Sequence, residues 1–136
     1  MHRLALFASI VVLAPHLAAA DVVRHSSIPE AYWGRWAASA GACGDADKAA
    51  MVLAAKTYVS PTANCAVDYV SEIAGTKGAI YSARLRCSDA AGGTQRKSVA
   101  NVIIRPDTAD RISVGPGFDS LVAYQRCSAS GTDTKP

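Results

Sequence analysis

Histidine is scarce in this chain, and this limits the chemistry that the sequence can support. Only three histidines are present, and two of them, His2 and His16, fall within the first twenty residues. If those residues are a cleaved leader, His25 alone remains, so we expect no site that needs two histidines, which excludes most zinc hydrolases. A single histidine near a chain end is most often solvated, and we expect this of His25.

Motifs that mark common enzymes are also missing. There is no Gly-x-Ser-x-Gly elbow, no glycine-rich phosphate loop and no recognisable histidine base for a serine nucleophile. Asp45-Ala46-Asp47 lacks the further oxygens and the glutamate of a calcium loop. We therefore expect no enzyme activity, no metal and no cofactor. One alternative stays open, an enzyme that acts on an envelope polymer through acidic residues such as Glu30 and Glu72.

Strong charge and long apolar stretches are missing as well. Residues 21–136 contain 13 basic and 11 acidic residues. The resulting net charge of +2 is too small to drive binding to a phosphate backbone. After residue 20, no stretch approaches the roughly 20 apolar residues of a membrane span. We therefore expect neither nucleic acid as a partner nor a membrane span.

What is present begins with a leader-like segment. Arg3 precedes an apolar run from Leu4 to Leu13, Pro15 interrupts that run, and Ala18-Ala19-Ala20 follows. This order is typical of a secretory signal peptide that is cleaved after Ala20. We therefore predict a signal peptide over residues 1–20 and a periplasmic or secreted protein.

The 116 residues that follow are enough for one domain and too few for two ordinary cores. Residues 21–27 are polar and unpatterned, and residues 129–136 are rich in Ser, Thr and Lys. We predict a flexible N-terminal arm over 21–27, a single β domain over 28–128 and a disordered tail over 129–136.

Short β-rich runs alternate with turn residues throughout the predicted domain. About seven strands with short loops predict an all-β antiparallel meander, closed as a barrel or folded as a sandwich. Residues 46–56 are rich in helix formers, but Thr57 to Val59 continue them with β-formers and Pro61 ends the run, which favours a strand. The expected strands are Tyr32–Ala37, Met51–Val59, Ala66–Ile73, Ala79–Cys87, Ser98–Arg105, Arg111–Val114 and Leu121–Cys127.

Four cysteines are expected to form two disulfides in an oxidising compartment. If Ala66–Ile73 and Ala79–Cys87 form a hairpin, Cys65 lies opposite Cys87 or one diagonal step away, and the two apolar faces coincide. We therefore predict the pair Cys65–Cys87, which leaves Cys43 with Cys127, although four cysteines allow three connectivities.

The same alternation places a polar face on this hairpin. Asp68 and Glu72 are expected on it, close to the arginines of the second strand. The basic residues around the expected Ala90–Gly93 turn form either an ordinary solvent face, which we favour, or a patch for an anionic envelope polymer or an acidic partner. The candidate patch consists of Arg84, Arg86, Arg96 and Lys97.

Gly34-Arg35-Trp36 resembles the opening Gly-x-Trp of lipocalin-like barrels, in which the tryptophan packs across the barrel floor. The resemblance implies a barrel with a small apolar ligand. We expect Trp33 and Trp36 to anchor the core and its edge, and the alternative is that Trp33, Trp36 and Tyr124 line a ligand.

A longer pattern resembles uncharacterised small exported proteins of alphaproteobacteria, and it implies a compact all-β domain with disulfides and no catalytic residue. Small periplasmic inhibitors of proteases and lysozymes are similar in being β-rich and disulfide-linked. We predict a non-catalytic binding or inhibitor-like domain whose partner is an envelope protein or an anionic envelope polymer, and the alternatives are a small apolar ligand carrier and the acidic enzyme. The pattern comprises Ile28-Pro29, Gly34-Arg35-Trp36, Cys43, Cys65, Cys87 and Tyr124-Gln125-Arg126-Cys127.

Overall fold

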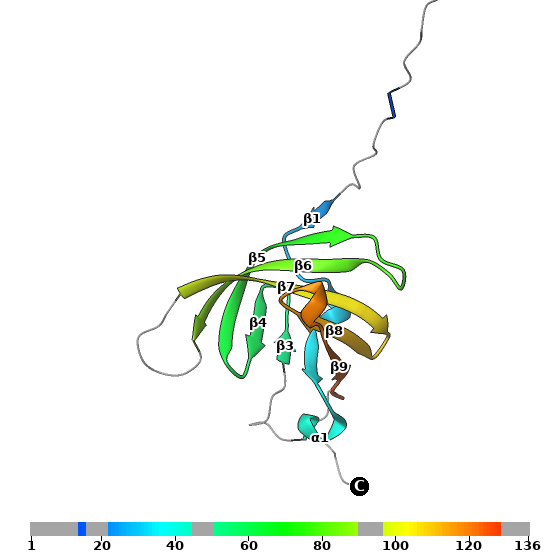
Figure 1. Ribbon diagram of the computed structural model, residues 1–136. Helices are drawn as coiled ribbons and strands as arrows, with labels where there is room; N and C mark the ends of the chain where they lie inside the picture. Colours follow the sequence, from blue (N-terminus) through cyan, green and yellow to red (C-terminus); the bar gives the residue numbers. More distant parts are fainter. Residues whose placement is uncertain (1–13, 16–21, 45–50, 90–96, 129–136) are drawn as a thin grey trace, which may run out of the picture.

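The computed structural model describes residues 14–15, 22–44, 51–89 and 97–128 (Figure 1). The predicted tail, Arg96, the Ala90–Gly93 turn and all but two residues of the predicted signal peptide lie outside these ranges. The strands are β1 (Val23–His25), β2 (Gly34–Ala37), β3 (Met51–Leu53), β4 (Thr57–Ser60), β5 (Ala63–Ile73), β6 (Ile80–Asp89), β7 (Lys97–Thr108), β8 (Arg111–Gly115) and β9 (Val122–Arg126). The short helices are η1 (Glu30–Tyr32), α1 (Ala40–Cys43) and η2 (Phe118–Ser120).

Strands β2 to β9 close into an antiparallel barrel of eight strands, and Figure 1 shows the curvature of the sheet. Each strand pairs with the next along the chain, and pairing of β2 with β9 joins the two ends of the sheet. Of the two predicted all-β architectures, the chain therefore adopts the barrel. No helix in the described ranges has both the length and the apolar character that a membrane crossing requires.

The N-terminal segment differs from the expected flexible arm, because β1 adds a ninth strand to the outside of the barrel. Strand β5 is 11 residues long, whereas β4 pairs only with its first four, Ala63 to Ala66. Beyond Ala66, strand β1 pairs with β5 at Val70 to Glu72. This pairing satisfies backbone groups of β5 that would otherwise lack a hydrogen-bond partner.

The expected strand over Met51–Val59 is divided in two, β3 and β4, by a turn over residues 54–56. The amide of Ala54 donates to the carbonyl of Thr57 at 3.0 Å, which closes the turn. The prediction of a strand rather than a helix is therefore correct for Met51 to Leu53, and residues 46–50 lie outside the described ranges.

A β-bulge between Val67 and Tyr69 changes which side chains of β5 face the barrel interior. Before the bulge Val67 is buried, and after it Val70 rather than Tyr69 is buried. The polar face predicted from strict alternation is therefore only half right. Asp68 meets Arg86 at 2.5 Å, but Glu72 is hydrogen-bonded to His25 instead.

Both predicted disulfides are present. Cys65 and Cys87 are directly paired across β5 and β6, with their Cα atoms 4.0 Å apart. Cys43 and Cys127 are 84 residues apart in sequence, and their bond ties α1 to the residue after β9. The first bond reinforces one hairpin, and the second holds the C-terminal strand that closes the barrel.

Trp36 contacts η1 at one end of the barrel, which we call the floor. Its side chain is fully buried, and its Nε1 donates to the carbonyl of Tyr32 in η1 at 2.9 Å. The guanidinium of Arg126 lies 4.2 Å from the centre of the Trp36 ring. The same guanidinium donates to the carbonyls of Trp33 and Ala31 at 2.9 and 2.6 Å, so it links η1 to the last strand.

Candidate binding site at the barrel mouth

Large side chains fill most of the barrel interior, and several small ones lie at the end opposite the floor, which we call the mouth. Trp36, Leu53, Leu85, Ile104 and Ile112 are among the largest fully buried side chains, and of these five only Leu85 also lines the cavity at the mouth. At the mouth, the register places small residues in line with inward-facing ones, since Ser98 pairs with the buried Cys87 and Ala100 with the buried Leu85. Ser98 and Ala100 are nevertheless exposed.

A cavity of about 370 Å³ results at the mouth. It receives residues from β4 to β9 and from the β8–β9 connection, so six strands hold its shape. Two tyrosines, Tyr58 and Tyr124, supply its largest side chains, and both pack against the core below. Apart from Asn101, the remaining lining is small or aliphatic and includes Ser60, Ala63, Ser98, Ala100, Val114 and Val122.

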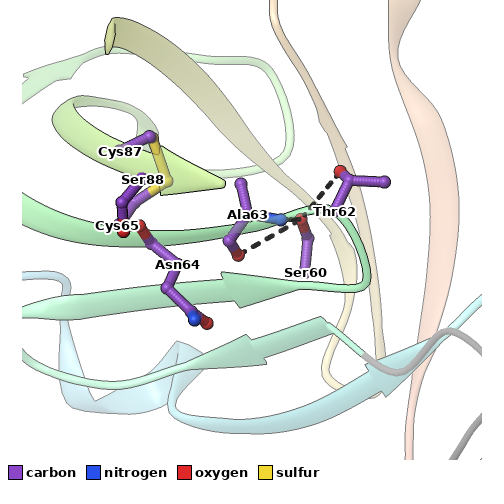
Figure 2. The surroundings of a disulfide bond; sticks show 7 residues. All are labelled: Ser60, Thr62, Ala63, Asn64, Cys65, Cys87 and Ser88. Atoms are coloured by element: carbon purple, nitrogen blue, oxygen red, sulfur yellow. Dashed lines mark hydrogen bonds between the residues drawn. A yellow bond between two sulfur atoms is a disulfide. The ribbon is translucent and has the colours of Figure 1, made fainter. Parts of the chain in front are cut away.

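Local hydrogen bonds fix the β4–β5 turn that forms one side of this cavity. The Ser60 hydroxyl accepts a hydrogen bond from the amide of Ala63 at 3.2 Å and lies 3.4 Å from the Thr62 hydroxyl. Figure 2 shows this turn beside the Cys65–Cys87 disulfide, and both cysteines also line the cavity. A hairpin locked by a covalent bond gives this wall of the mouth a preformed shape.

Burial raises the pKa of the Tyr58 phenol above its ordinary value, and the nearby Tyr124 raises it further. Tyr58 is therefore neutral at physiological pH and offers a hydroxyl that can both donate and accept. The charged groups found in the other described cavities are missing from this lining. The mouth therefore suits a neutral molecule with apolar surface and one or two polar atoms.

The raised pKa of Tyr58 predicts a loss of stability at alkaline pH. A phenol with a raised folded pKa stabilises the fold fully below its unfolded pKa of about 10, and this contribution is lost as the pH rises through the folded pKa. We expect the free energy of unfolding to fall above about pH 10 and to fall less steeply in Tyr58→Phe. Urea unfolding at pH 9, 10 and 11 measures both slopes, and equal slopes would contradict the assignment.

The basic patch predicted from the sequence lies outside the barrel, away from the mouth cavity. Arg84 and Arg86 are two residues apart on β6 and both face outward. Arg84 donates to Asn101 at 3.4 Å, and Arg86 is paired with Asp68. Lys97 is exposed at the start of β7, and Arg96 lies outside the described residues.

The aromatic candidates are divided between the two ends of the barrel. Trp36 lies in the core at the floor, and Trp33 is 39% exposed with its Nε1 donating to the carbonyl of Ile28 at 2.8 Å. Of the three, Tyr124 alone lines the mouth cavity. Tyr58, which also lines it, was missed by sequence reasoning, since nothing distinguishes it from any other tyrosine in a β-rich run.

His25 is placed differently from the solvated residue that the sequence suggests. It is half-buried on β1, hydrogen-bonded to Glu72 and 6.1 Å from the Tyr81 ring between centres. Glu72 contributes to one further cavity near the β5–β6 turn, and no other carboxylate lines it. Within the described ranges, no group of three or more residues of the His, Cys, Asp and Glu types is arranged to hold a metal ion.

Comparison with protein-family models, with curated proteins and with solved structures finds no match to this chain. The resemblances noted from its motifs therefore stay predictions, and the geometry of the barrel carries the functional argument.

Proposed function

We propose that this protein is an exported, non-catalytic binding protein that takes a small, neutral, largely apolar molecule into the mouth of its barrel. One observation carries the proposal: the inward-facing positions of β7 at the mouth hold the small residues Ser98 and Ala100, and a cavity of about 370 Å³ lies beside them. That volume is within the range of small-molecule pockets. The inhibitor-like role favoured from the sequence needs no such cavity.

Export to the periplasm or beyond is part of the same proposal. Its support is the leader-like segment over residues 1–20 and the two disulfides, which form and persist in oxidising compartments. Free thiols in protein recovered from its native location would contradict export.

Binding of the neutral fluorescent probe N-phenyl-1-naphthylamine tests the mouth site. We expect saturable binding to the oxidised protein and a loss of about tenfold in Ala100→Leu, because overpacking a formed site costs about 1–3 kcal/mol. The matched control is Ala123→Leu, which adds the same side chain at an exposed, outward-facing position of β9 outside the lining of the mouth, and this variant should bind the probe like the wild type. Unchanged binding in Ala100→Leu, or an equal loss in Ala123→Leu, would overturn the proposal.

A second candidate is a protein-interaction module, and one observation favours it. Phe118 in η2 and Val122 at the start of β9 are 57% and 50% exposed, and η2 also contributes Ser120 to the mouth. Exposed aromatic side chains at a rim are typical anchors for a protein partner. A periplasmic protein whose binding is lost in Phe118→Ala and kept in Ala100→Leu would favour this candidate over the ligand carrier.

The acidic enzyme has no comparable support. It requires two carboxylates that converge in one cleft, whereas the described residues that line the mouth cavity include no carboxylate and those that line the cavity near the β5–β6 turn include one, Glu72.

A further inference from the structure

Two neighbouring rows of side chains cross the outer face of β4, β5, β6 and β7. The register aligns Thr57, Ala66, Arg86 and Val99 in the first row and Val59, Asn64, Ser88 and Lys97 in the second. Between them lies the row that contains Cys65 and Cys87, whose side chains are buried. Because alternate residues of a strand face opposite sides, both outer rows face away from the barrel interior.

These rows line a hollow of about 500 Å³, larger than the cavity at the mouth. The residues of β5 in it, Asn64 and Ala66, are short, and Ala66 lies between the longer side chains of the neighbouring strands. Val59 and Val99 supply apolar surface on either side, and Val99 is 57% exposed. A branched apolar side chain left this open beside a hollow offers a contact surface for the apolar part of a ligand.

Two cationic side chains, Arg86 and Lys97, line the hollow, and no carboxylate of the described residues does. The hydrogen bond from Arg86 to Asp68 uses Nε, so it orients the guanidinium, whose two terminal nitrogens are the donors that bind an anion in forked geometry. Asp68 itself is outside the lining.

From this arrangement we propose that the outer hollow is a second binding site, specific for a medium-chain carboxylate amphiphile. Its carboxylate lies between Arg86 and Lys97, and its alkyl chain begins beside Val99 and crosses Ala66 to contact Val59. The outer rows and the mouth lie on opposite faces of the same strands, and the two linings have Cys65, Cys87 and Ser98 in common.

Titration with decanoate tests this site, with decyltrimethylammonium as the probe of opposite charge and acetate as the probe without a chain. We expect amide NMR shifts at Ala66, Arg86 and Val99 with decanoate and much smaller ones with the other two. The Arg86→Gln and Lys97→Gln double variant is expected to bind decanoate at least about tenfold more weakly, since it removes both charged donors. Ala66→Leu should also weaken binding, because leucine fills the centre of the hollow.

The matched control is Arg84→Gln. Arg84 has the same charge and the same outward direction on β6, but it is outside the lining of the hollow. Decanoate affinity should stay within about twofold of wild type in this variant, as distant surface charges interact weakly. An equal loss in Arg84→Gln would overturn the proposal in favour of a diffuse basic surface, and shifts at Tyr58 and Tyr124 instead of the outer rows would place decanoate in the mouth. Equal binding of decyltrimethylammonium would also overturn it.

Discussion

Reduction of both disulfides is expected to unfold this barrel under conditions in which the oxidised protein is stable. On the chain-entropy model, the Cys65–Cys87 bond, with a sequence separation of 22, contributes on the order of 3 kcal/mol. The Cys43–Cys127 bond, with a separation of 84, contributes about 4–5 kcal/mol. The total stability of a domain of this size is typically about 5–15 kcal/mol, so losing both removes most of it. Urea unfolding followed by circular dichroism, with and without a phosphine reductant, measures the difference.

Two double variants measure the contribution of each disulfide to stability separately: Cys65→Ala with Cys87→Ala, and Cys43→Ala with Cys127→Ala. We expect the second pair to lose more stability, because its bond closes the longer loop and holds the strand that pairs with β2. The first bond joins two strands that already share ten paired residues, so much of their contact survives without it. A reduced protein with an unchanged unfolding midpoint would contradict this account.

The β5–β6 hairpin and its disulfide could be predicted because several independent constraints coincide there. The turn, the alternation of apolar residues and the positions of Cys65 and Cys87 each require the same register. Once that pair is assigned, Cys43 and Cys127 remain. Closure of the sheet into a barrel was harder to predict from the sequence, because a meander of short strands is equally compatible with a sandwich.

The bulge and the ninth strand could not be predicted for a common reason. A single extra residue between Val67 and Tyr69 reverses the alternation, and no residue type there marks it. Strand β1 depends on a length mismatch between β4 and β5, and it pairs through backbone groups that carry no sequence signal. The pairing of His25 with Glu72 depends on both features, so it was beyond sequence reasoning.

The mouth cavity also lies beyond what the sequence can indicate. Ser60, Ala63, Ser98 and Ala100 are ordinary small residues of β-rich runs, and they leave a hollow only because the register brings them to the same end of the barrel. The basic residues give a second example of an arrangement that the sequence alone does not indicate. Arg86 and Lys97 could be grouped from the sequence with Arg84, whereas the register places only the first two in the lining of the outer hollow.

Replacement of Trp36 by alanine is expected to lower the free energy of unfolding by about 3–5 kcal/mol, the usual cost of truncating a buried aromatic residue. Trp36 is fully buried, and it closes the floor against η1 and against Arg126 of the last strand. Its loss removes packing at the point where β2 and β9 join to close the barrel. Urea unfolding of the oxidised protein measures the effect. The matched control is Trp33→Ala, which should lower the free energy of unfolding much less, because Trp33 is partly exposed.

The role of Arg126 is separated from that of Trp36 by a double-mutant cycle. Arg126→Met keeps an unbranched side chain over the Trp36 ring but removes the donors to the carbonyls of Trp33 and Ala31. We expect this variant to lose about 1.5–3 kcal/mol, the usual range for hydrogen bonds from a charged group. In the Trp36→Ala background the loss should be smaller, because the guanidinium is no longer held in place by the ring and η1 has already lost its contact with the barrel. Equal losses in both backgrounds would mean that the arginine and the tryptophan act independently, and the floor would then be two separate contacts instead of one interlocked unit.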